Sequence, residues 1–344
     1  MPIQMAQTFG GQIDEGVITR GLVLCIIGTG TPNSILARLR ASSEAITPPI
    51  IQQFPGNAFG AVFSPNGDMV AFAHYTTPFL TMYKRTGNTF LPFPTLQSIP
   101  TAGGRDCAFS PDGQHFAFAQ IASPFISIYE RVADAFTKLT NPNVLPGGTA
   151  YGCAYSPDSQ FLAVAHSSSP FITVYKRSGN TYTKLPDPDV LPTGIGMCCR
   201  FSPDGMYLAV AHYNSPFVTI YKRNLDTFTK LPNPTVLPTG NGNGCAFSPD
   251  GVHLAVAHAS SPNITIYKRE GDTFTKLPNP VQLPSGAGNG CAFSPGGLYL
   301  VVANSSIPGH SIYQRRDDTF TRLPAVSGIT GMSIGNGVAM FDYK

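Results

Sequence analysis

The 344-residue sequence is poor in charge and contains no long apolar run. Asp, Glu, Lys and Arg make up 12% of the residues, about half of what an ordinary soluble domain carries. The net charge of +3 is too small to indicate a nucleic-acid partner. The longest apolar candidate, residues 22–27, is far shorter than the ~20 residues of a membrane-spanning helix. We therefore expect neither nucleic-acid binding nor membrane insertion.

The sequence also lacks a secretion signal, and its number of cysteines is odd. The sequence has seven cysteines, and residues 1–11 contain neither the basic region nor the apolar region of a signal peptide. Both features argue against a disulfide framework and for synthesis in a reducing cytoplasm.

Glycine and proline are abundant, at 35 and 32 residues, and some of them mark a repeat. The tripeptide Phe-Ser-Pro, once with Tyr in place of Phe, begins at Phe63, Phe109, Tyr155, Phe201, Phe247 and Phe293. A proline that follows a short Ser/Thr loop recurs at Pro78, Pro124, Pro170, Pro216, Pro262 and Pro308. Each step is 46 residues, and one further step back from Pro78 reaches Pro32 in a degenerate first copy. The sequence therefore predicts seven copies of one unit.

Each copy predicts four short β-strands separated by Pro, Gly and Asp turns. In the fifth copy we expect strands over residues 242–247, 253–258, 264–268 and 273–277. A four-stranded unit of this size cannot bury both faces alone, whereas radial stacking hides them and leaves only short edges. We predict an all-β, seven-bladed β-propeller of four-stranded antiparallel blades over residues 17–344, preceded by an N-terminal arm (residues 1–16). Residues 335–343 repeat the first strand of a unit, so we expect them to close the ring by joining the first blade.

The motifs Phe-Ser-Pro-Asp-Gly, Leu-Ala-Val-Ala-His and Tyr-Lys-Arg resemble those of WD-repeat propellers over residues 17–344. The chain departs from that pattern because it has no Trp, and Tyr-Lys or Tyr-Arg stands where the Trp-Asp pair would be. The longer segment over residues 169–177, followed by Thr-Lys-Leu-Pro, is similar to repeats of phage-encoded and bacterial propellers. That resemblance implies a virion protein.

Several polar residue types recur once per unit, and each has two interpretations. A ring of thiols from Cys107, Cys153, Cys199, Cys245 and Cys291 could suggest a metal site, but ligands from different blades lack the close spacing of zinc sites, so we interpret them as packing residues. The basic residues Lys84, Arg85, Lys176, Arg177, Lys222, Arg223, Lys268 and Arg269 could form a girdle for an anionic partner. We favour a role in protecting exposed strand edges. The recurring Ser-Pro-Asp-Gly is a tight turn.

No sequence motif indicates catalysis. Neither a Gly-x-Ser-x-Gly elbow, a phosphate loop nor a His-Glu-x-x-His helix is present. The blades look too alike to build one asymmetric set of acids and bases. We therefore predict no catalytic, cofactor-binding or metal-binding residue and a chain that is not an enzyme.

Binding is expected where the loops of one propeller face vary. We predict a binding site near Tyr75, Tyr151 and Tyr213. We include in this site the histidines that end the expected second strand in four copies, His74, His166, His212 and His258. The favoured role for these histidines is a hydrogen bond to the backbone of the adjacent turn. The hypothesis is a non-enzymatic phage virion protein of assembly or host attachment, with other virion proteins or a host-surface glycan or receptor as partners and oligomerisation through the arm. The alternatives are a lactonase-type propeller enzyme and a cytoplasmic WD-type interaction scaffold.

Overall fold

The computed structural model describes residues 21–30, 34–40, 52–54, 58–87, 89–93, 98–324 and 332–343. The strands before residue 55 and after residue 331 are described by their backbone alone. Every regular element in these ranges is a β-strand, and no helix among them is long and apolar enough to cross a membrane. The expected N-terminal arm, residues 1–16, lies outside the described residues.

Six consecutive repeats each form a four-stranded antiparallel sheet whose strands pair in chain order. The first three sheets are β4 (Ala58–Phe63), β5 (Met69–His74), β6 (Leu80–Thr86) and β7 (Thr89–Pro92); β8 (Gly104–Phe109), β9 (His115–Gln120), β10 (Ile126–Val132) and β11 (Ala135–Lys138); and β12 (Ala150–Tyr155), β13 (Phe161–His166), β14 (Ile172–Ser178) and β15 (Thr181–Lys184). The next three are β16 (Gly196–Phe201), β17 (Tyr207–His212), β18 (Val218–Asn224) and β19 (Thr227–Lys230); β20 (Gly242–Phe247), β21 (His253–His258), β22 (Ile264–Glu270) and β23 (Thr273–Lys276); and β24 (Gly288–Phe293), β25 (Tyr299–Asn304), β26 (His310–Arg316) and β27 (Thr319–Arg322).

One more four-stranded sheet combines the two ends of the described chain. Its order is β28 (Met332–Tyr343), β1 (Gly21–Gly30), β2 (Ser34–Arg40) and β3 (Gln52–Phe54). The strand β28 pairs antiparallel with β1, with Gly21 opposite Tyr343 and Ile27 opposite Gly337. The sequence expects this pairing for residues 335–343.

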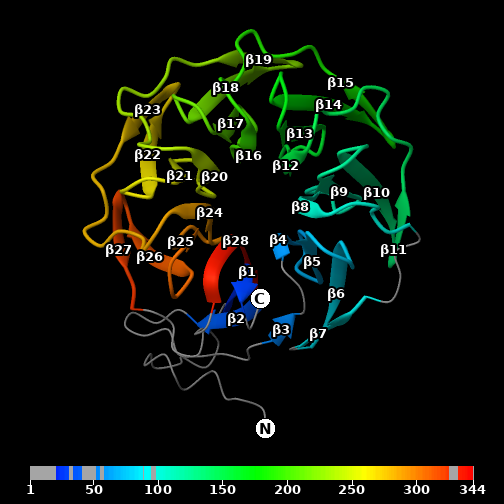
Figure 1. Ribbon diagram of the computed structural model, residues 1–344, viewed down its shortest axis with the longest axis horizontal. Helices are drawn as coiled ribbons and strands as arrows, with labels where there is room; N and C mark the ends of the chain where they lie inside the picture. The colour runs from blue at the N-terminus through cyan, green and yellow to red at the C-terminus, as the bar shows by residue number, and fades with distance from the viewer. Residues whose placement is uncertain are drawn as a thin grey trace.

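The sheets stand around a common centre, with the first strand of each repeat inside and the fourth outside (Figure 1). The predicted all-β propeller of four-stranded antiparallel blades is confirmed. The expected number of seven blades is not confirmed, because the structure describes six blades with their side chains. The sheet that contains β28 is described by its backbone alone.

The second strand of each repeat carries the core, because all six of its residues are buried in every described copy. Successive side chains of a strand point to opposite faces. In β13, Phe161 and Ala163 pack with Leu208 of the following blade, whereas Leu162 packs with Ala117 of the preceding one. Each fully buried aliphatic side chain contributes about 1.5–3 kcal/mol, so the interfaces between blades hold most of the hydrophobic stabilisation.

Aromatic residues also connect neighbouring blades. The Phe161 and Phe228 rings of adjacent blades meet edge to face at 6.2 Å, and Phe93 meets Phe136 in the same way at 5.8 Å. The Tyr175 hydroxyl donates a hydrogen bond to the Val144 carbonyl at 2.8 Å, which fastens a blade to the loop that enters it.

The recurring Asp of the Ser-Pro-Asp-Gly turn forms an ion pair with the next blade. Asp158 receives a hydrogen bond from Arg223 at 2.9 Å, and this guanidinium also lies 4.7 Å from the Phe161 ring centroid. The equivalent pairs are Arg177–Asp112, Arg269–Asp204 and Arg315–Asp250. In the copy that begins with β4 the turn position is Asn66, and Arg131 pairs instead with Asp68, two residues later. The lysine before each of three of these arginines also pairs with the following blade, in Lys176–Asp226, Lys222–Asp272 and Lys268–Asp318.

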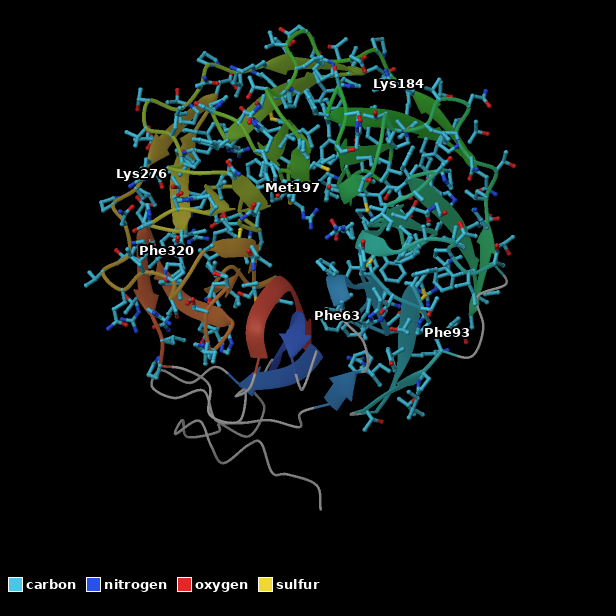
Figure 2. All side chains as sticks on the ribbon, in the orientation of Figure 1. Phe63, Phe93, Lys184, Met197, Lys276 and Phe320 are labelled. Carbon is cyan, nitrogen blue, oxygen red and sulfur yellow. The ribbon has the colours of Figure 1, made fainter. Side chains whose placement is uncertain are left out.

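Much of the expected basic girdle is thus neutralised within the ring. Two lysines of the fourth strands, Lys184 and Lys276, lie at the outer rim, whereas Met197 faces the centre (Figure 2). The structure therefore separates an outer surface, where charges pair locally, from a central opening.

The ion pair between Arg223 and Asp158 provides a test of blade stacking. We expect Arg223→Met and Asp158→Asn each to lower the free energy of unfolding, with a coupling energy of about 1 kcal/mol between them because the pair is partly buried. Urea denaturation of both single variants and the double variant measures it. Strictly additive losses would show that this contact does not hold the blades together.

Candidate functional site

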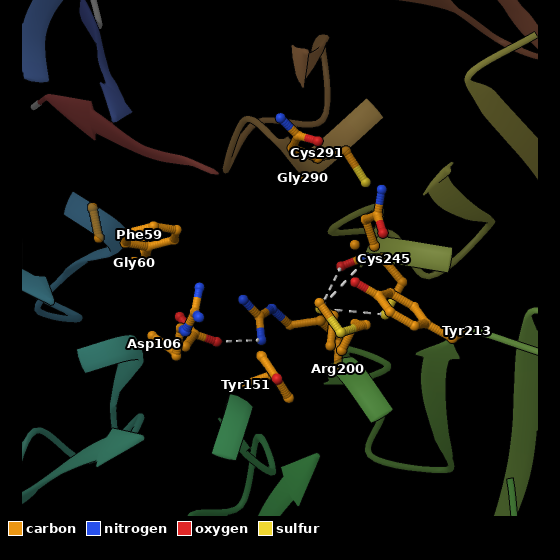
Figure 3. Close-up of a pocket in the computed structure, with 16 residues that line it drawn as sticks. Phe59, Gly60, Asp106, Tyr151, Arg200, Tyr213, Cys245, Gly290 and Cys291 are labelled. Carbon is orange, nitrogen blue, oxygen red and sulfur yellow. Dashed lines mark hydrogen bonds and ion pairs between the residues drawn. The ribbon is translucent and has the colours of Figure 1, made fainter. Parts of the chain in front are cut away.

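A pocket of about 340 Å³ lies where the first strands of six blades converge. Its walls come from β4, β8, β12, β16, β20 and β24, so each of these blades contributes residues (Figure 3). Equivalent residues are 46 positions apart in the sequence. The lining therefore consists of a few repeat positions, each contributed by several of the six blades. A pocket built in this way is asymmetric only where the copies differ.

Glycine is the usual residue at one of these positions because the inner strands approach one another closely. A Cβ atom on Gly60 would lie 2.6 Å from the Cα atom of Asp106, and one on Gly152 would lie 2.9 Å from the Cα atom of Cys198. Gly244 and Gly290 occupy the same position in two other blades. Asp106 and Cys198 are therefore departures from the glycine pattern, and both line the pocket.

The Asp106 carboxylate joins three blades at the pocket wall. Its Oδ1 atom accepts the Cys107 amide at 2.9 Å, and its Oδ2 atom accepts the Cys153 amide of the next blade at 3.2 Å. The same Oδ2 atom lies 3.3 Å from Nη1 of Arg200, which belongs to the blade beyond. Two amides and a guanidinium hold this carboxylate in a fixed position.

Arg200 reaches into the pocket from β16. Its Nη1 atom also donates to the carbonyls of Cys199 at 2.8 Å and Cys153 at 3.2 Å. Burial opposes the charge, but the neighbouring Cys198 and Asp106 raise the pKa of this guanidinium further. Arg200 is thus a fixed cation beside a fixed carboxylate.

A second cation, Arg105, is held by aromatic rings. Its guanidinium carbon lies 4.7 Å from the Phe59 ring centroid, 5.2 Å from that of Tyr75 and 5.3 Å from that of Tyr151. Such contacts position a guanidinium through its faces. Among the described residues, the buried Nε atom has no hydrogen-bond partner. The aromatic cage therefore fixes Arg105 at the wall of the pocket.

The three tyrosines predicted from loop variation lie together at this pocket. Tyr151 and Tyr213 line it, and Tyr75 contacts the Arg105 guanidinium. Tyr75 and Tyr213 are exposed. Their part in ligand binding stays a prediction.

The four predicted histidines lie elsewhere, buried between the second and third strands. In each, Nε2 lies within 2.7–2.9 Å of a threonine hydroxyl seven residues later, in the pairs His74–Thr81, His166–Thr173, His212–Thr219 and His258–Thr265. Gln120 and Asn304 form the same link with Ser127 and Ser311. None of the four lines the pocket, so the geometry assigns them a connection between strands.

The repeated cysteines also serve packing. Their sulfur atoms approach carbonyls of the preceding blade's second strand, as Cys153 does at Ala117 (4.0 Å) and Cys199 does at Ala163 (3.5 Å). Within the described residues, no group of three or more His, Cys, Asp or Glu side chains could hold a metal ion.

Sequence reasoning missed the role of Arg105, Asp106 and Arg200, although a signal was available. At the repeat position of Arg200 the other five described copies have Val62, Ala108, Ala154, Ala246 and Ala292. An arginine in a series of small apolar residues is a break in the repeat. Only the ring shows that this break meets Asp106, which is 94 residues away in sequence.

No protein-family model and no curated protein sequence matches the chain. Solved structures do. A protein from Lactobacillus plantarum superimposes with a TM-score of 0.73 at 18% identity, over 94% of this chain and 99% of that one. A protein from Bacteroides uniformis, provisionally named a 6-phosphogluconolactonase, gives 0.72 at 16% identity over 93% and 99%. The periplasmic gluconolactonase of Pseudomonas aeruginosa gives 0.70 at 17% over 92% and 97%.

At these identities the likeness shows the fold alone. The fold neighbours are propellers with lactonase names rather than WD-repeat proteins, so the WD-repeat resemblance is corrected.

The expectation of a non-enzymatic phage virion protein is contradicted as well. The similar propellers carry enzyme names, and the argument that the blades are too alike for an active site fails at Arg105, Asp106 and Arg200. The expected partners, and oligomerisation through residues 1–16, rested on the virion hypothesis and stay predictions.

The buried histidines predict acid sensitivity. Burial lowers the pKa of His166 from 6.5 to about 4, so the folded state resists a proton that the unfolded chain takes up. Stability therefore falls as the pH drops from 6.5 towards 4. We expect His166→Gln, which copies the residue at position 120, to remove about 1–2 kcal/mol of the loss between pH 7.5 and pH 5. Urea denaturation at both pH values measures it, and an equal acid loss in the variant would contradict a neutral buried His166.

Proposed function

We propose that the protein is a hydrolase of the lactonase type that opens a small anionic lactone in the central pocket. The observation that carries the proposal is the convergence of Arg105 and Asp106 from one blade and Arg200 from another on one pocket. A volume of about 340 Å³ suits a small molecule. The fold neighbours that bear lactonase names support the same reaction class.

Lactone hydrolysis needs a base for water and positive charge near the carbonyl oxygen. Water adds to the carbonyl carbon, the ring C–O bond then breaks, and a hydroxy acid results. In our proposal Asp106 takes the proton from water, a role for which its oxygens are held in place by amides. The Arg200 guanidinium stabilises the negative charge that develops on the carbonyl oxygen. Its own hydrogen bonds to two carbonyls hold it ready for that task.

The charges of the pocket indicate an anionic substrate. Two arginines and one aspartate are the charged residues among those that line it, so the lining has an excess positive charge. Arg105, caged by three rings at the pocket wall, would bind a carboxylate or phosphate group through the terminal nitrogens of its guanidinium. The exposed Tyr213 supplies a hydroxyl at the same pocket for a polar, sugar-like body.

The proposal takes the ring as complete, with the sheet formed by β28, β1, β2 and β3 as its seventh blade. The register between β28 and β1 supports this, as does the count of four-stranded sheets. Closure would hold β4 and β24 in place, and both of these strands contribute to the pocket lining.

Hydrolysis of a lactone panel tests the proposed function. The purified protein would be given 6-phosphogluconolactone as the anionic substrate, and gluconolactone and other uncharged lactones of similar size for comparison, and acid release would be followed at constant pH. We expect hydrolysis above the spontaneous rate, with anionic lactones favoured. Asp106→Asn should lower kcat at least ~100-fold because it removes the base. Arg105→Gln should raise KM for the charged lactones much more than it lowers kcat.

Two variants distant from the pocket serve as matched controls. Asp226→Asn changes a carboxylate of the outer rim that pairs with Lys176, and Arg316→Gln changes an exposed arginine at the end of β26. Both should keep the rates of the unchanged protein. Absence of hydrolysis above the spontaneous rate with every lactone, in a protein shown to be folded, would overturn the proposal.

A further inference from the structure

Two cysteines of neighbouring blades touch at the wall of the pocket. Cys198 belongs to β16 and Cys245 to β20, and their sulfur atoms are 3.7 Å apart. Both side chains are buried, and both line the pocket. A disulfide requires sulfur atoms about 2.05 Å apart, so these two sulfur atoms must approach each other further for a bond to form.

Cys198 differs from the other cysteines of the inner strands because it does not belong to the series spaced by 46 residues. It stands at the repeat position of Asp106. The parallel extends to the contacts: Asp106 accepts the amide of Cys153 one blade further on, and the Cys198 sulfur faces the amide of Cys245 one blade further on, at 3.4 Å. The Cys245 carbonyl is 3.7 Å from the same sulfur. The amide of Cys245 therefore faces the Cys198 sulfur in the same way as the amide of Cys153 faces the Asp106 carboxylate.

The surrounding groups differ for the two sulfurs. The thiol of Cys245 donates to Cys198 and lowers the pKa of Cys198 against the effect of burial, and Arg200 on the same strand adds to that effect while Asp106 opposes it. The same hydrogen bond, together with burial, raises the pKa of Cys245. One sulfur is therefore disposed to be a thiolate and the other a thiol. A thiolate is the nucleophile in thiol oxidation.

We propose that Cys198 and Cys245 form a modification site for a small hydroperoxide, which converts the pair into a disulfide between the two blades. The Cys198 thiolate attacks one peroxide oxygen, the O–O bond breaks, and a sulfenic acid and hydroxide (or alkoxide) result. The Cys245 thiol then attacks the sulfenic sulfur, its proton leaves with the hydroxyl as water, and the S–S bond forms. Both sulfurs are oxidised and the hydroperoxide is reduced by two electrons. Because the pair lines the pocket, the oxidant reaches it through the pocket.

This inference does not depend on the proposed function, since the bond itself is the readout. The fully reduced chain, freed of reductant, would be treated with one equivalent of hydrogen peroxide, blocked with N-ethylmaleimide and digested with trypsin without reduction. We expect a cross-linked pair of peptides and the loss of two thiols per chain. Cleavage after Lys184 and Arg200 leaves Cys198 and Cys199 on one peptide, so fragment ions must assign the bond to Cys198.

The rate of the reaction gives a second, independent measure. Because only the thiolate reacts, the rate should rise about tenfold per pH unit until Cys198 is ionised. In Cys245→Ser the reaction should stop at the sulfenic acid of Cys198, which dimedone captures. Cys153→Ser is the matched control, since Cys153 contacts a carbonyl rather than a second thiol, and it should leave the cross-link unchanged.

Two results would overturn the inference. One is an unchanged protein that loses no thiols, or loses them without a bond between Cys198 and Cys245. The other is a Cys198→Ser variant that consumes peroxide as fast as the unchanged protein. The first measurement uses the native chain alone, so it decides the matter even if a cysteine variant does not fold.

Discussion

The burial of both faces of every blade is the constraint on which the rest of the structure depends. A four-stranded sheet such as β12–β15 places Phe161 and Leu162 on opposite faces, and each of these residues needs a different neighbouring blade to cover it. A single blade cannot bury either face by itself. A ring of blades buries the faces of each member, and ion pairs such as Arg223–Asp158 connect neighbouring blades at the surface as well.

The ring also determines where chemical variety can arise. The inner strands come so close that glycine is the usual residue at positions such as Gly60 and Gly152. A side chain at such a position reaches the inner strand of the next blade, as Asp106 reaches Cys153. Substitutions in separate copies, Asp106 in one and Arg200 in another, therefore meet at one pocket. In the same way Cys198 reaches Cys245 of the next blade. A nearly uniform repeat thus produces an asymmetric centre from a few departures.

The period and turns of the sequence were enough to predict most of the fold. The Phe-Ser-Pro step located each blade, and the similarity between residues 335–343 and a first strand indicated how the ends meet. The candidate site was predicted in part. Of the tyrosines chosen by loop variation, Tyr151 and Tyr213 line the pocket and Tyr75 contacts Arg105, while their part in binding stays a prediction. The histidines were included on polarity alone, and the structure gives them threonine partners inside the sheets.

The expected virion role was wrong because it rested on a resemblance of short repeat motifs, whereas similar propellers carry lactonase names. The expectation of no enzyme rested on the similarity among the blades, which was taken for uniformity of the centre. The sequence by itself determined the repeat length, the four strands of each unit and the residues that must be buried, since these follow from local periodicity. Only the tertiary structure decided that Arg105, Asp106 and Arg200 share one pocket. Their proximity arises from the closing of the ring, which brings together residues up to 95 positions apart, and no local pattern encodes the distance between two blades.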